Sequence, residues 1–290
     1  MIKTEKETET FRAGQGQKGE MRLRFEVKGD KTILTDRYHT NTLKICKPFY
    51  LEKETGRIRI LQLSIGGGIL RGDYLYSEYD LGAGSKVMVT AQSSTKVYKT
   101  PFGKSRQVVN FRLAENSELE YITYPTIPYA GSNFKSEMII ELHKGCKAFL
   151  TEIVSPGRLS RGESFQYLAY HSQVKAYWEG RLILWDNWKL TPQTMDIHTL
   201  GFFEGYTHYG NVFILSDDQC INQNLVTKIH EKLVEHADII AGASIIAKQK
   251  GIMVRMLGTA AMHLEDAVNV VWDIMRQELM GLPRPDVRQY

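Results

Sequence analysis

The sequence predicts a mainly β fold, with many short strands wound as a β-solenoid or as layered sheets, followed by about two C-terminal α-helices. Between residues 21 and 185, apolar and polar residues alternate in short runs, which is the period of half-buried strands. Turn residues separate these runs at intervals of about ten positions, and this spacing favours a sandwich, barrel or solenoid over a βαβ sheet. Beyond about residue 222 the apolar residues recur at helical spacing instead.

Composition and charge exclude several classes of protein. The chain has 290 residues, of which 42% are hydrophobic and 24% are charged, so it can bury a large core without disulfides. Its net charge of +4 is not gathered in a basic block, which argues against nucleic-acid binding. No apolar run approaches the ~18 residues of a membrane span, and the polar N-terminus does not form a secretory signal. The three cysteines lack zinc-binding spacing, so we expect reduced thiols and a cytoplasmic protein.

The N-terminal strands begin after a polar segment. Residues 1–18 have no hydrophobic period and are expected to form a flexible tail, whereas residues 19–290 are expected to form one β-rich domain. Gly29-Asp30 is a hairpin turn signal between the first two strands. These early strands are predicted at residues 21–28, 32–35, 43–45 and 57–65, with a loop at 36–39.

The stretch from Ser64 to Thr100 is the first candidate for function. A glycine triplet precedes an Arg-Gly-Asp sequence, and such a run of glycines marks a tight, crowded turn. Two alternating runs follow, and the second ends in the polar cluster Gln92–Lys96. Because no Gly-Lys-Ser/Thr follows the triplet, this turn is not a nucleotide-binding loop. The residues of the turn are Gly66, Gly67, Gly68, Gly72 and Asp73.

Further strands continue the alternating pattern up to residue 185. They are predicted at residues 106–113, 119–123, 135–142, 147–153, 164–174 and 181–185, with a loop bracketed by Pro125 and Pro128. The last part, about residues 222–281, is predicted as helix, hairpin and helix. Its elements are a helix at 222–237, a hairpin of 239–247 with 252–257, and a helix at about 260–280 that begins at the N-cap Thr259 and stops at Gly281 and Pro283. The apolar stripe of the last helix must be covered by the β core or by a partner protein.

Two polar segments contain hydroxyl and charged side chains, but neither contains a complete catalytic arrangement. In the cluster Gln92–Lys96 no His or Asp pattern completes a nucleophile, so a polar wall that holds water is the better interpretation. In the segment Thr151–Phe165, Arg158 and Glu163 are expected either to form a surface ion pair or to let Glu163 line a cavity with Glu152. Carboxylates bind divalent ions weakly enough to release them, whereas imidazole and thiolate hold nickel more tightly.

A third polar segment, Gly201–Asn211, surrounds His208 with aromatic residues and glycines. A single histidine in such a setting is more often a hydrogen-bonded structural residue than a metal ligand. The segment is predicted to be a crowded turn or an interface.

Four blocks of the sequence, taken in order, resemble the urease accessory protein family called UreD, or UreH in some systems. The second block contains Thr-x-Gln-x-x-Thr-Lys-x-Tyr, the third Gly-Arg-x-x-x-Gly-Glu-x-Phe, and the fourth Tyr-x-His-Tyr. The blocks are Gly66–Asp73, Thr90–Lys99, Thr151–Phe165 and Glu204–Asn211, and the resemblance covers about residues 20–280.

The resemblance implies a helix-poor β fold of solenoid-like winding and a non-enzymatic metallochaperone scaffold that binds apo-urease. It implies partnership with the helical accessory protein UreF and the nickel-carrying GTPase UreG, with a homodimer as one form of the assembly. It also implies an internal, water-filled route by which nickel reaches the urease active site. No cofactor is expected to be tightly bound, and Ni²⁺ would pass only transiently.

The resemblance also assigns residues to these roles by their positions in the matched blocks. The residues expected to line the nickel route are Asp73, Ser94, Thr95, Glu152 and Glu163. Its three carboxylates, Asp73, Glu152 and Glu163, are expected to bind nickel transiently, without a stable metal site. Arg158 is expected to orient Glu163, and the structural glycines are Gly66, Gly67, Gly68, Gly72 and Gly162. His208, Tyr209 and the C-terminal helices are the candidates for contact with UreF.

Two alternatives remain open at this stage. A β-solenoid enzyme acting on carbohydrate would need two carboxylates at the ~5–10 Å separations of glycoside hydrolysis, and Glu152 and Glu163 could supply them. A plain protein–protein scaffold without a metal route would keep both its complexes and urease activation after loss of the acidic residues.

Overall fold

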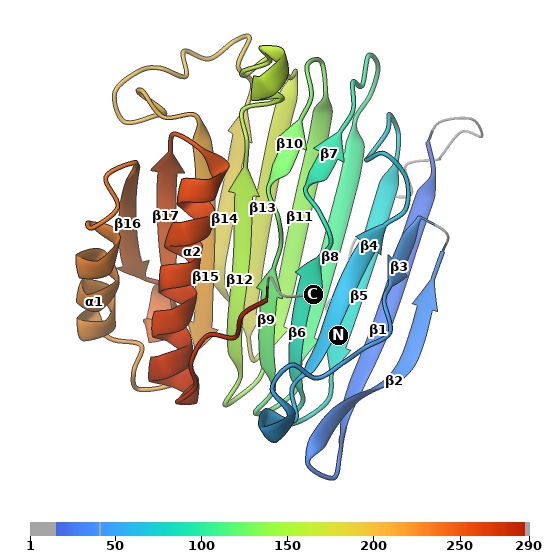
Figure 1. Cartoon of the computed structure of the whole chain (residues 1–290), viewed down its shortest axis with the longest axis vertical. Helices are drawn as coiled ribbons and strands as arrows, with labels where there is room; N and C mark the ends of the chain where they lie inside the picture. The colour runs from blue at the N-terminus through green and yellow to red at the C-terminus, as the bar shows by residue number, and fades with distance from the viewer. Residues whose placement is uncertain (1–15, 41, 288–290) are drawn as a thin grey trace.

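Two β-sheets lie face to face in the computed structural model, which describes residues 16–40 and 42–287 (Figure 1). The rear sheet of this view contains seven described strands: β1 (Lys18–Lys28), β2 (Lys31–His39), β5 (Tyr74–Leu81), β8 (Ser105–Leu113), β11 (Asn133–Leu142), β13 (Ala169–Trp178) and β14 (Arg181–Leu190). The front sheet contains ten: β3 (Leu43–Ile45), β4 (Ile58–Ser64), β6 (Lys86–Ala91), β7 (Thr95–Val97), β9 (Glu118–Ile122), β10 (Thr126–Pro128), β12 (Lys147–Val154), β15 (His208–Ser216), β16 (Ile239–Ile245) and β17 (Gly251–Gly258).

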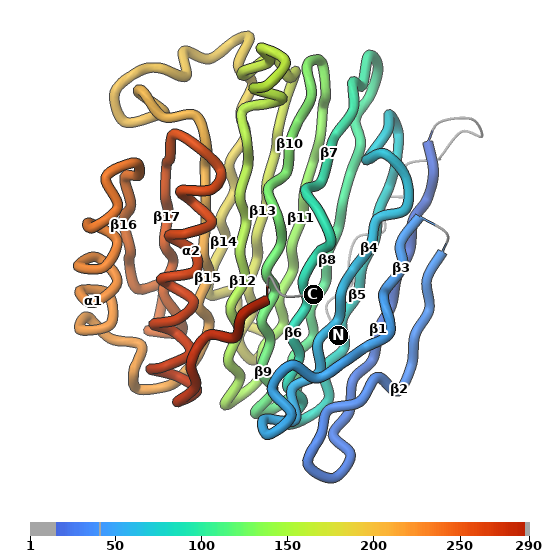
Figure 2. The backbone as a smooth tube through the Cα atoms, in the orientation of Figure 1, coloured from blue at the N-terminus to red at the C-terminus, as the bar shows by residue number. Residues whose placement is uncertain are grey.

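The chain winds as a stacked coil between these sheets. From β4 to β13 it alternates between them, so that β4, β6, β9 and β12 are neighbours in front, and β5, β8, β11 and β13 are neighbours behind (Figure 2). Neighbouring strands of this coil run parallel within each sheet. The predicted β-rich, solenoid-like fold is therefore confirmed.

Antiparallel strands flank the coil at both ends. The hairpin β1–β2 forms one end of the rear sheet, and β14 pairs with β13 at the other. In the front sheet, β15, β17 and β16 follow β12 in antiparallel order. The short strands β7 and β10 pair in parallel with each other, and Thr126 of β10 pairs with Val154 of β12.

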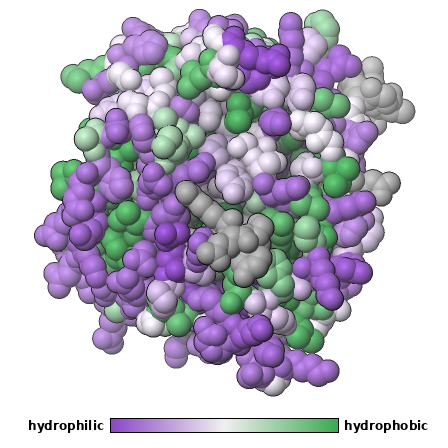
Figure 3. All heavy atoms as spheres, viewed as in Figure 1, coloured by the Kyte–Doolittle hydropathy of each residue, from purple (hydrophilic) through white to green (hydrophobic). Residues whose placement is uncertain are grey.

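The C-terminal helices cover part of the outer face of the front sheet. They are α1 (Gln223–Leu233) and α2 (Ala261–Met275), and α2 continues as a π-helical turn at Arg276–Met280. Short 3-10 turns lie at Lys53–Thr55, Leu159–Arg161 and Ala247–Gln249. Trp272 of α2 stacks on Phe149 of β12, with ring centroids 6.3 Å apart. The apolar stripe of α2 is thus covered by the β core, and hydrophilic side chains cover most of the surface over the helices (Figure 3).

The apolar core between the sheets is built from the inward-facing positions of the coil. Tyr79 of β5 stacks on Phe111 of β8 at 5.0 Å between ring centroids, and Phe111 meets Tyr121 of β9 edge-on at 4.9 Å. Such aromatic contacts add to the free energy gained by burial. Beyond this core, the space between the sheets contains a polar layer and a further apolar cluster that includes Phe134 and Tyr170.

Two segments predicted as loops contain strand residues, so these two predictions were partly wrong. Residues 36–39 belong to β2, whose last four residues pair with β1 although most of their surface is exposed. An edge strand pairs on one side only, so polar residues along it hide the strand pattern. The segment between Pro125 and Pro128 contains the three-residue strand β10.

After residue 160, one strand begins later than predicted, one was not predicted, and one extends beyond its predicted end. The strand predicted at 164–174 begins only at Ala169, because Phe165 and Tyr167 lie in the loop before it and pack in an apolar cluster with residues of β11, β13 and β15. β15 was not predicted, and all nine of its residues are buried. Since it lies between the rear sheet and α2, neither of its faces is exposed and the alternating pattern is lost. β14 also extends to Leu190, beyond the predicted end at residue 185.

The predicted C-terminal helices form, with small changes at their ends. α1 begins after Asn222, whose side chain accepts hydrogen bonds from the backbone N–H groups of Asn224 and Leu225. The predicted N-cap of α2 was wrong: Ala260 occupies that position, and the Thr259 hydroxyl bonds to His263 Nδ1 at 2.9 Å. None of the described helices has the length and apolar character needed to cross a membrane. Residues 1–15 of the predicted flexible tail lie outside the described residues, and Lys18 begins β1.

Candidate functional site

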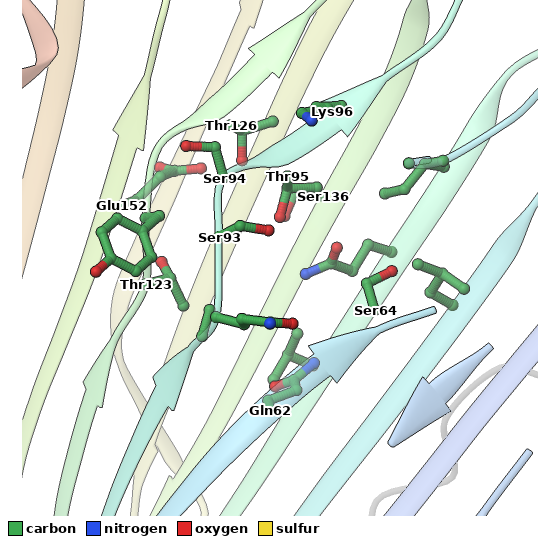
Figure 4. Close-up of a pocket in the computed structure, with 18 of the residues that line it drawn as sticks. Gln62, Ser64, Ser93, Ser94, Thr95, Lys96, Thr123, Thr126, Ser136 and Glu152 are labelled. Atoms are coloured by element: carbon green, nitrogen blue, oxygen red, sulfur yellow. The ribbon is translucent and has the colours of Figure 1, made fainter. Parts of the chain in front are cut away.

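A polar cavity of about 130 Å³ lies between the two sheets, where β4, β6 and β9 end (Figure 4). Since a water molecule takes about 30 Å³ of liquid volume, the cavity has room for several. Its polar lining consists of Gln62, Ser64, Gln92, Ser93, Ser94, Thr95, Lys96, Gln107, Thr123, Thr126, Ser136, Thr151 and Glu152. Among the described lining residues, only Lys96 and Glu152 carry a charge.

The cavity arises because inward-facing positions change from apolar to polar along each strand. On β4, Ile60 belongs to the apolar core and Gln62 lines the cavity. On β12, likewise, Leu150 belongs to the apolar core and Glu152 lines the cavity. Side chains two residues apart on a strand share a face, so a change in residue type at the end of a strand creates a polar layer above the core.

One side of the cavity reaches the protein surface beside the glycine triplet. Ser64, Gly66, Gln92 and Ser93 are exposed and also line the cavity. Gly68 lets this turn approach β7 closely, because a Cβ there would lie 2.4 Å from the carbonyl oxygen of Lys96. We call this exposed side the front mouth.

The Ser-Ser-Thr cluster forms a wall of the cavity, as does Glu152. Ser94 and Thr95 lie in the lining, and the Thr95 N–H donates to the Pro125 carbonyl at 3.1 Å. Figure 4 shows Ser94 near Glu152, and Thr95 beside Ser136. Three of the five residues expected on the nickel route therefore share one cavity.

Glu152 is held by neutral hydrogen-bond donors. Its Oε1 accepts from Ser172 Oγ at 2.7 Å and from the Tyr170 hydroxyl at 3.4 Å, and its Oε2 accepts from Asn211 Nδ2 at 3.4 Å. Burial raises the pKa of the Glu152 carboxyl and nearby Asp186 raises it further, whereas the Ser172 hydrogen bond opposes the shift. A positive ion in the cavity would stabilise the ionised form.

Asp73 lies outside the lining of this cavity. Its carboxylate accepts hydrogen bonds from the backbone N–H groups of Leu70 at 2.7 Å and Gln17 at 2.8 Å. These contacts close the turn that contains Gly72, which has a φ of 76°. The structure thus gives Asp73 a local role in the turn, and its contact with nickel stays a prediction.

Glu163 also lies outside the cavity, in an ion pair with Arg158. Arg158 Nε donates to Glu163 Oε2 at 2.8 Å, and a second guanidinium nitrogen bonds to Oε1. The Arg158 hydrogen bonds hold the pKa of Glu163 below its ordinary value. Gly162 ends the short turn between the two residues with a φ of 73°. Glu152 and Glu163 do not share a pocket, so the carboxylate pair required by the carbohydrate-enzyme alternative is not assembled at this cavity.

His208 and Tyr209 lie in β15 and expose little surface. Their exposed fractions are 3% and 7%, and His208 Nδ1 bonds to the Thr207 hydroxyl at 2.9 Å. Burial lowers the pKa of His208 to about 4. The contact of these two residues with a partner stays a prediction. Tyr209 also belongs to the polar layer, because its hydroxyl donates to Asn211 Oδ1 at 3.0 Å.

The sequence reasoning missed the residues that continue this polar layer. They are Tyr170, Ser172, Asp186, Asn211 and Arg255. Asn211 stands in a matched block, but the others lie in strands whose alternation looks ordinary. Within residues 16–40 and 42–287, no group of three or more His, Cys, Asp or Glu side chains could hold a metal ion, and all three cysteines are free thiols.

Comparisons with known proteins identify the relatives of this chain. A sequence model of the UreD urease accessory protein family matches residues 17–289. A protein of Acetivibrio thermocellus named urease accessory protein UreD is 33% identical over 260 residues, which is 90% of this chain and 98% of its own length. Proteins of the same name from two strains of Staphylococcus aureus are 27% identical over 274 residues, 94% of this chain and 98% of theirs.

The fold and the cavity define a two-sheet β-solenoid protein with an internal polar layer, and its relatives are accessory proteins of urease. The chain belongs to the UreD urease accessory protein family. This assignment confirms the resemblance drawn from the four sequence blocks.

Proposed function

We propose that this protein delivers nickel to apo-urease through its internal polar cavity, as a non-catalytic member of an assembly with UreF and UreG. The observation that carries the proposal is a single carboxylate, Glu152, in a cavity whose polar lining otherwise consists of hydroxyl and amide groups and Lys96. The family supplies the connection to urease.

The chemistry of the lining suits a passing cation better than a resident one. Hydroxyl and amide oxygens can replace part of the water shell of Ni²⁺, and one carboxylate offsets part of its charge. Imidazole and thiolate ligands, which hold nickel more tightly, are absent from the described lining. Weak oxygen ligands therefore favour transfer and release.

The decisive experiment replaces Glu152 with its neutral isostere. Glu152→Gln is co-expressed with the other urease accessory proteins and apo-urease, and complexes are measured by pull-down and activation by nickel-dependent urease activity. We expect the complexes to persist while the activation rate falls about tenfold, which equals the loss of ~1.4 kcal/mol of cation stabilisation.

Glu179→Gln is the matched control, because this exposed carboxylate pairs with His143 and lies outside the cavity. We expect it to activate urease as the parent does. If Glu152→Gln also activates at the parental rate, the protein is a scaffold without a metal route. If the parent protein does not co-purify with the accessory proteins, the proposed assembly is wrong.

A further inference from the structure

We propose that a basic surface pocket, separate from the polar cavity, binds an acidic peptide segment of a partner protein. The pocket has a volume of about 450 Å³, and its lining includes Tyr98, Lys99, Tyr129, Arg158, Gln166 and Gln193. None of these residues lines the polar cavity. The inference therefore goes beyond the nickel route and holds whether or not the cavity carries a metal ion.

The pocket lies where several loops connect the front sheet with the rear sheet. Residues 98–104 join β7 to β8, residues 129–132 join β10 to β11, and residues 155–168 join β12 to β13. A fourth loop, between β14 and β15, contributes Gln193. In Figure 1 these loops gather at the upper end of the two sheets, so the pocket belongs to this end of the solenoid.

Two aromatic rings and a guanidinium group form a stack in the lining. The ring centroids of Tyr98 and Tyr129 lie 4.9 Å apart, and the guanidinium carbon of Arg158 lies 4.0 Å from the Tyr129 centroid. A guanidinium over an aromatic face is held by cation–π attraction. The stack therefore places a positive charge beside apolar ring surface.

Positive charge exceeds negative charge in this pocket. Lys99 and Arg158 are the cations of its described lining, and Glu163 is the acid. Glu163 is already bound, because it accepts hydrogen bonds from Arg158 Nε at 2.8 Å and from the Ala130 N–H at 3.2 Å. Lys99 is exposed, and among the described residues no carboxylate forms an ion pair with it. The pocket thus has the charge needed to attract an anion.

The surroundings of the pocket favour an acidic side chain of a peptide as this anion. Gln166 and Gln193 are exposed, and their amides supply N–H donors for carboxylate oxygens. Two large apolar side chains are exposed on the same loops, Phe102 with 78% and Leu159 with 48% of their surface. Apolar side chains beside a charged pocket are typical of protein interfaces. The ligand is therefore a segment in which acidic residues have apolar neighbours.

Two of the four sequence blocks meet at this pocket. The second block ends in Tyr98 and Lys99, and the third contains Arg158 and Glu163. The polar cavity includes none of these four residues. The pocket thus gives a common place to the parts of two blocks that the cavity leaves unused.

Fluorescence anisotropy of a labelled peptide tests the pocket in the full chain. The probe is fluorescein-labelled Gly-Leu-Glu-Phe-Glu-Leu-Gly, and a control probe carries glutamine in place of both glutamates. We expect Lys99→Met to weaken binding of the acidic probe about fivefold, because it removes the charge and keeps the apolar stem of the side chain. Lys99→Arg should retain the parental affinity. Lys28→Met removes an exposed lysine at the end of β1, away from these loops, and should leave binding unchanged.

The glutamine probe should bind the parent and Lys99→Met equally. If the acidic probe also binds these two proteins equally, or if the glutamine probe binds the parent as tightly as the acidic probe does, the pocket does not bind acidic peptides. Free glutarate that displaces the probe at an equal concentration would show a site for small carboxylates and overturn the peptide site. Urea unfolding of Lys99→Met should match the parent, and Lys99→Gln replaces this variant if it does not.

Discussion

Glu152 is a buried carboxylate whose hydrogen-bond donors are all neutral side chains. Burial of an ionised group without a paired charge reduces stability, so such a group persists where it has another use. Glu120 shows the contrasting arrangement, because its carboxylate receives two hydrogen bonds from buried Arg276. Because of this difference, Glu152 is the residue of the cavity on which the proposed nickel route depends.

Glu152→Gln is expected to increase the free energy of unfolding while it reduces urease activation. The pKa of Glu152 is raised in the folded protein, so the native state binds the proton more tightly than the unfolded state. The stability contributed by this group is present at low pH and is lost as pH rises through the folded pKa. The advantage of the glutamine variant in urea unfolding should therefore grow as pH rises above the ordinary glutamate pKa and through the raised folded value. A variant less stable than the parent at the higher pH would contradict this account.

His208 is expected to make the protein sensitive to acid. Its pKa is lowered to about 4, so between about pH 6.5 and pH 4 the unfolded state binds more protons and stability falls as pH falls. The full effect is ~3 kcal/mol, since one pKa unit corresponds to 1.36 kcal/mol. Urea unfolding of His208→Gln should lose less stability over this range than the parent. His171→Gln, on the outer face of the rear sheet, is the control and should keep the pH dependence of stability seen in the parent. If His208→Gln also keeps that pH dependence, His208 is not the group that causes the acid sensitivity.

At the scale of elements, a buried ion network attaches the end of α2 to the coil. Arg276 is fully buried, donates to both oxygens of Glu120 on β9 at 3.0 and 2.9 Å, and also bonds to Glu52. Arg57, which is 2% exposed, bonds to Glu118 at 2.5 Å and lies 3.7 Å from Glu120. Because these partners are far apart in the sequence, the network specifies where the helix ends on the sheet.

Arg276→Ala is expected to lower the free energy of unfolding by ~3–5 kcal/mol, because it leaves Glu120 charged, buried and short of a partner. Arg24→Ala, in the exposed pair with Asp80, should cost no more than ~1 kcal/mol. Chemical denaturation of both variants at the same pH measures the contrast. Equal losses of unfolding free energy in the two variants would show that burial does not make the Arg276 ion pair more important for stability than an exposed pair.

The described part of the molecule combines three buried apolar clusters with one polar layer. One of these clusters contains Phe134, Tyr170 and Tyr209. The coil encloses the core between the sheets, and the helices enclose a second core against the front sheet. The polar layer lies between the sheets, above the first core, and it is continuous because neighbouring strands are in register. A solenoid thus forms a polar layer along its axis wherever the same position of successive coils is polar.

Removal of residues 259–290 is expected to make the protein aggregate, because it uncovers the apolar outer face of the front sheet. That face includes Phe149, Ile153, Val212 and Val254, which pack in the cluster that α2 covers. Large exposed apolar patches favour association. Size-exclusion chromatography should show a larger share of aggregated protein than the full chain gives, whereas truncation after Gly281, which keeps α2, should leave that share unchanged. An unchanged elution profile for the shorter chain would contradict this arrangement of layers.

The sequence by itself determined the β-rich class, most strands, both helices and the family. Alternation identifies a strand when one face is buried and the other exposed, and it failed for β15, which is buried on both faces. Thr259 has the residue type of an N-cap, yet the backbone places Ala260 there. The motif blocks identified Ser94, Thr95 and Glu152, because these residues stand in recognisable sequence patterns.

Only the tertiary structure decided which of the candidate residues share a site. Asp73 closes a turn and Glu163 pairs with Arg158, while Glu152 joins Asn211 and Asp186 in a layer that no local pattern reveals. Local periodicity reports whether a side chain faces the core or the solvent. Membership of a cavity depends on cross-strand register and on the packing of one sheet over the other, and long-range contacts determine both.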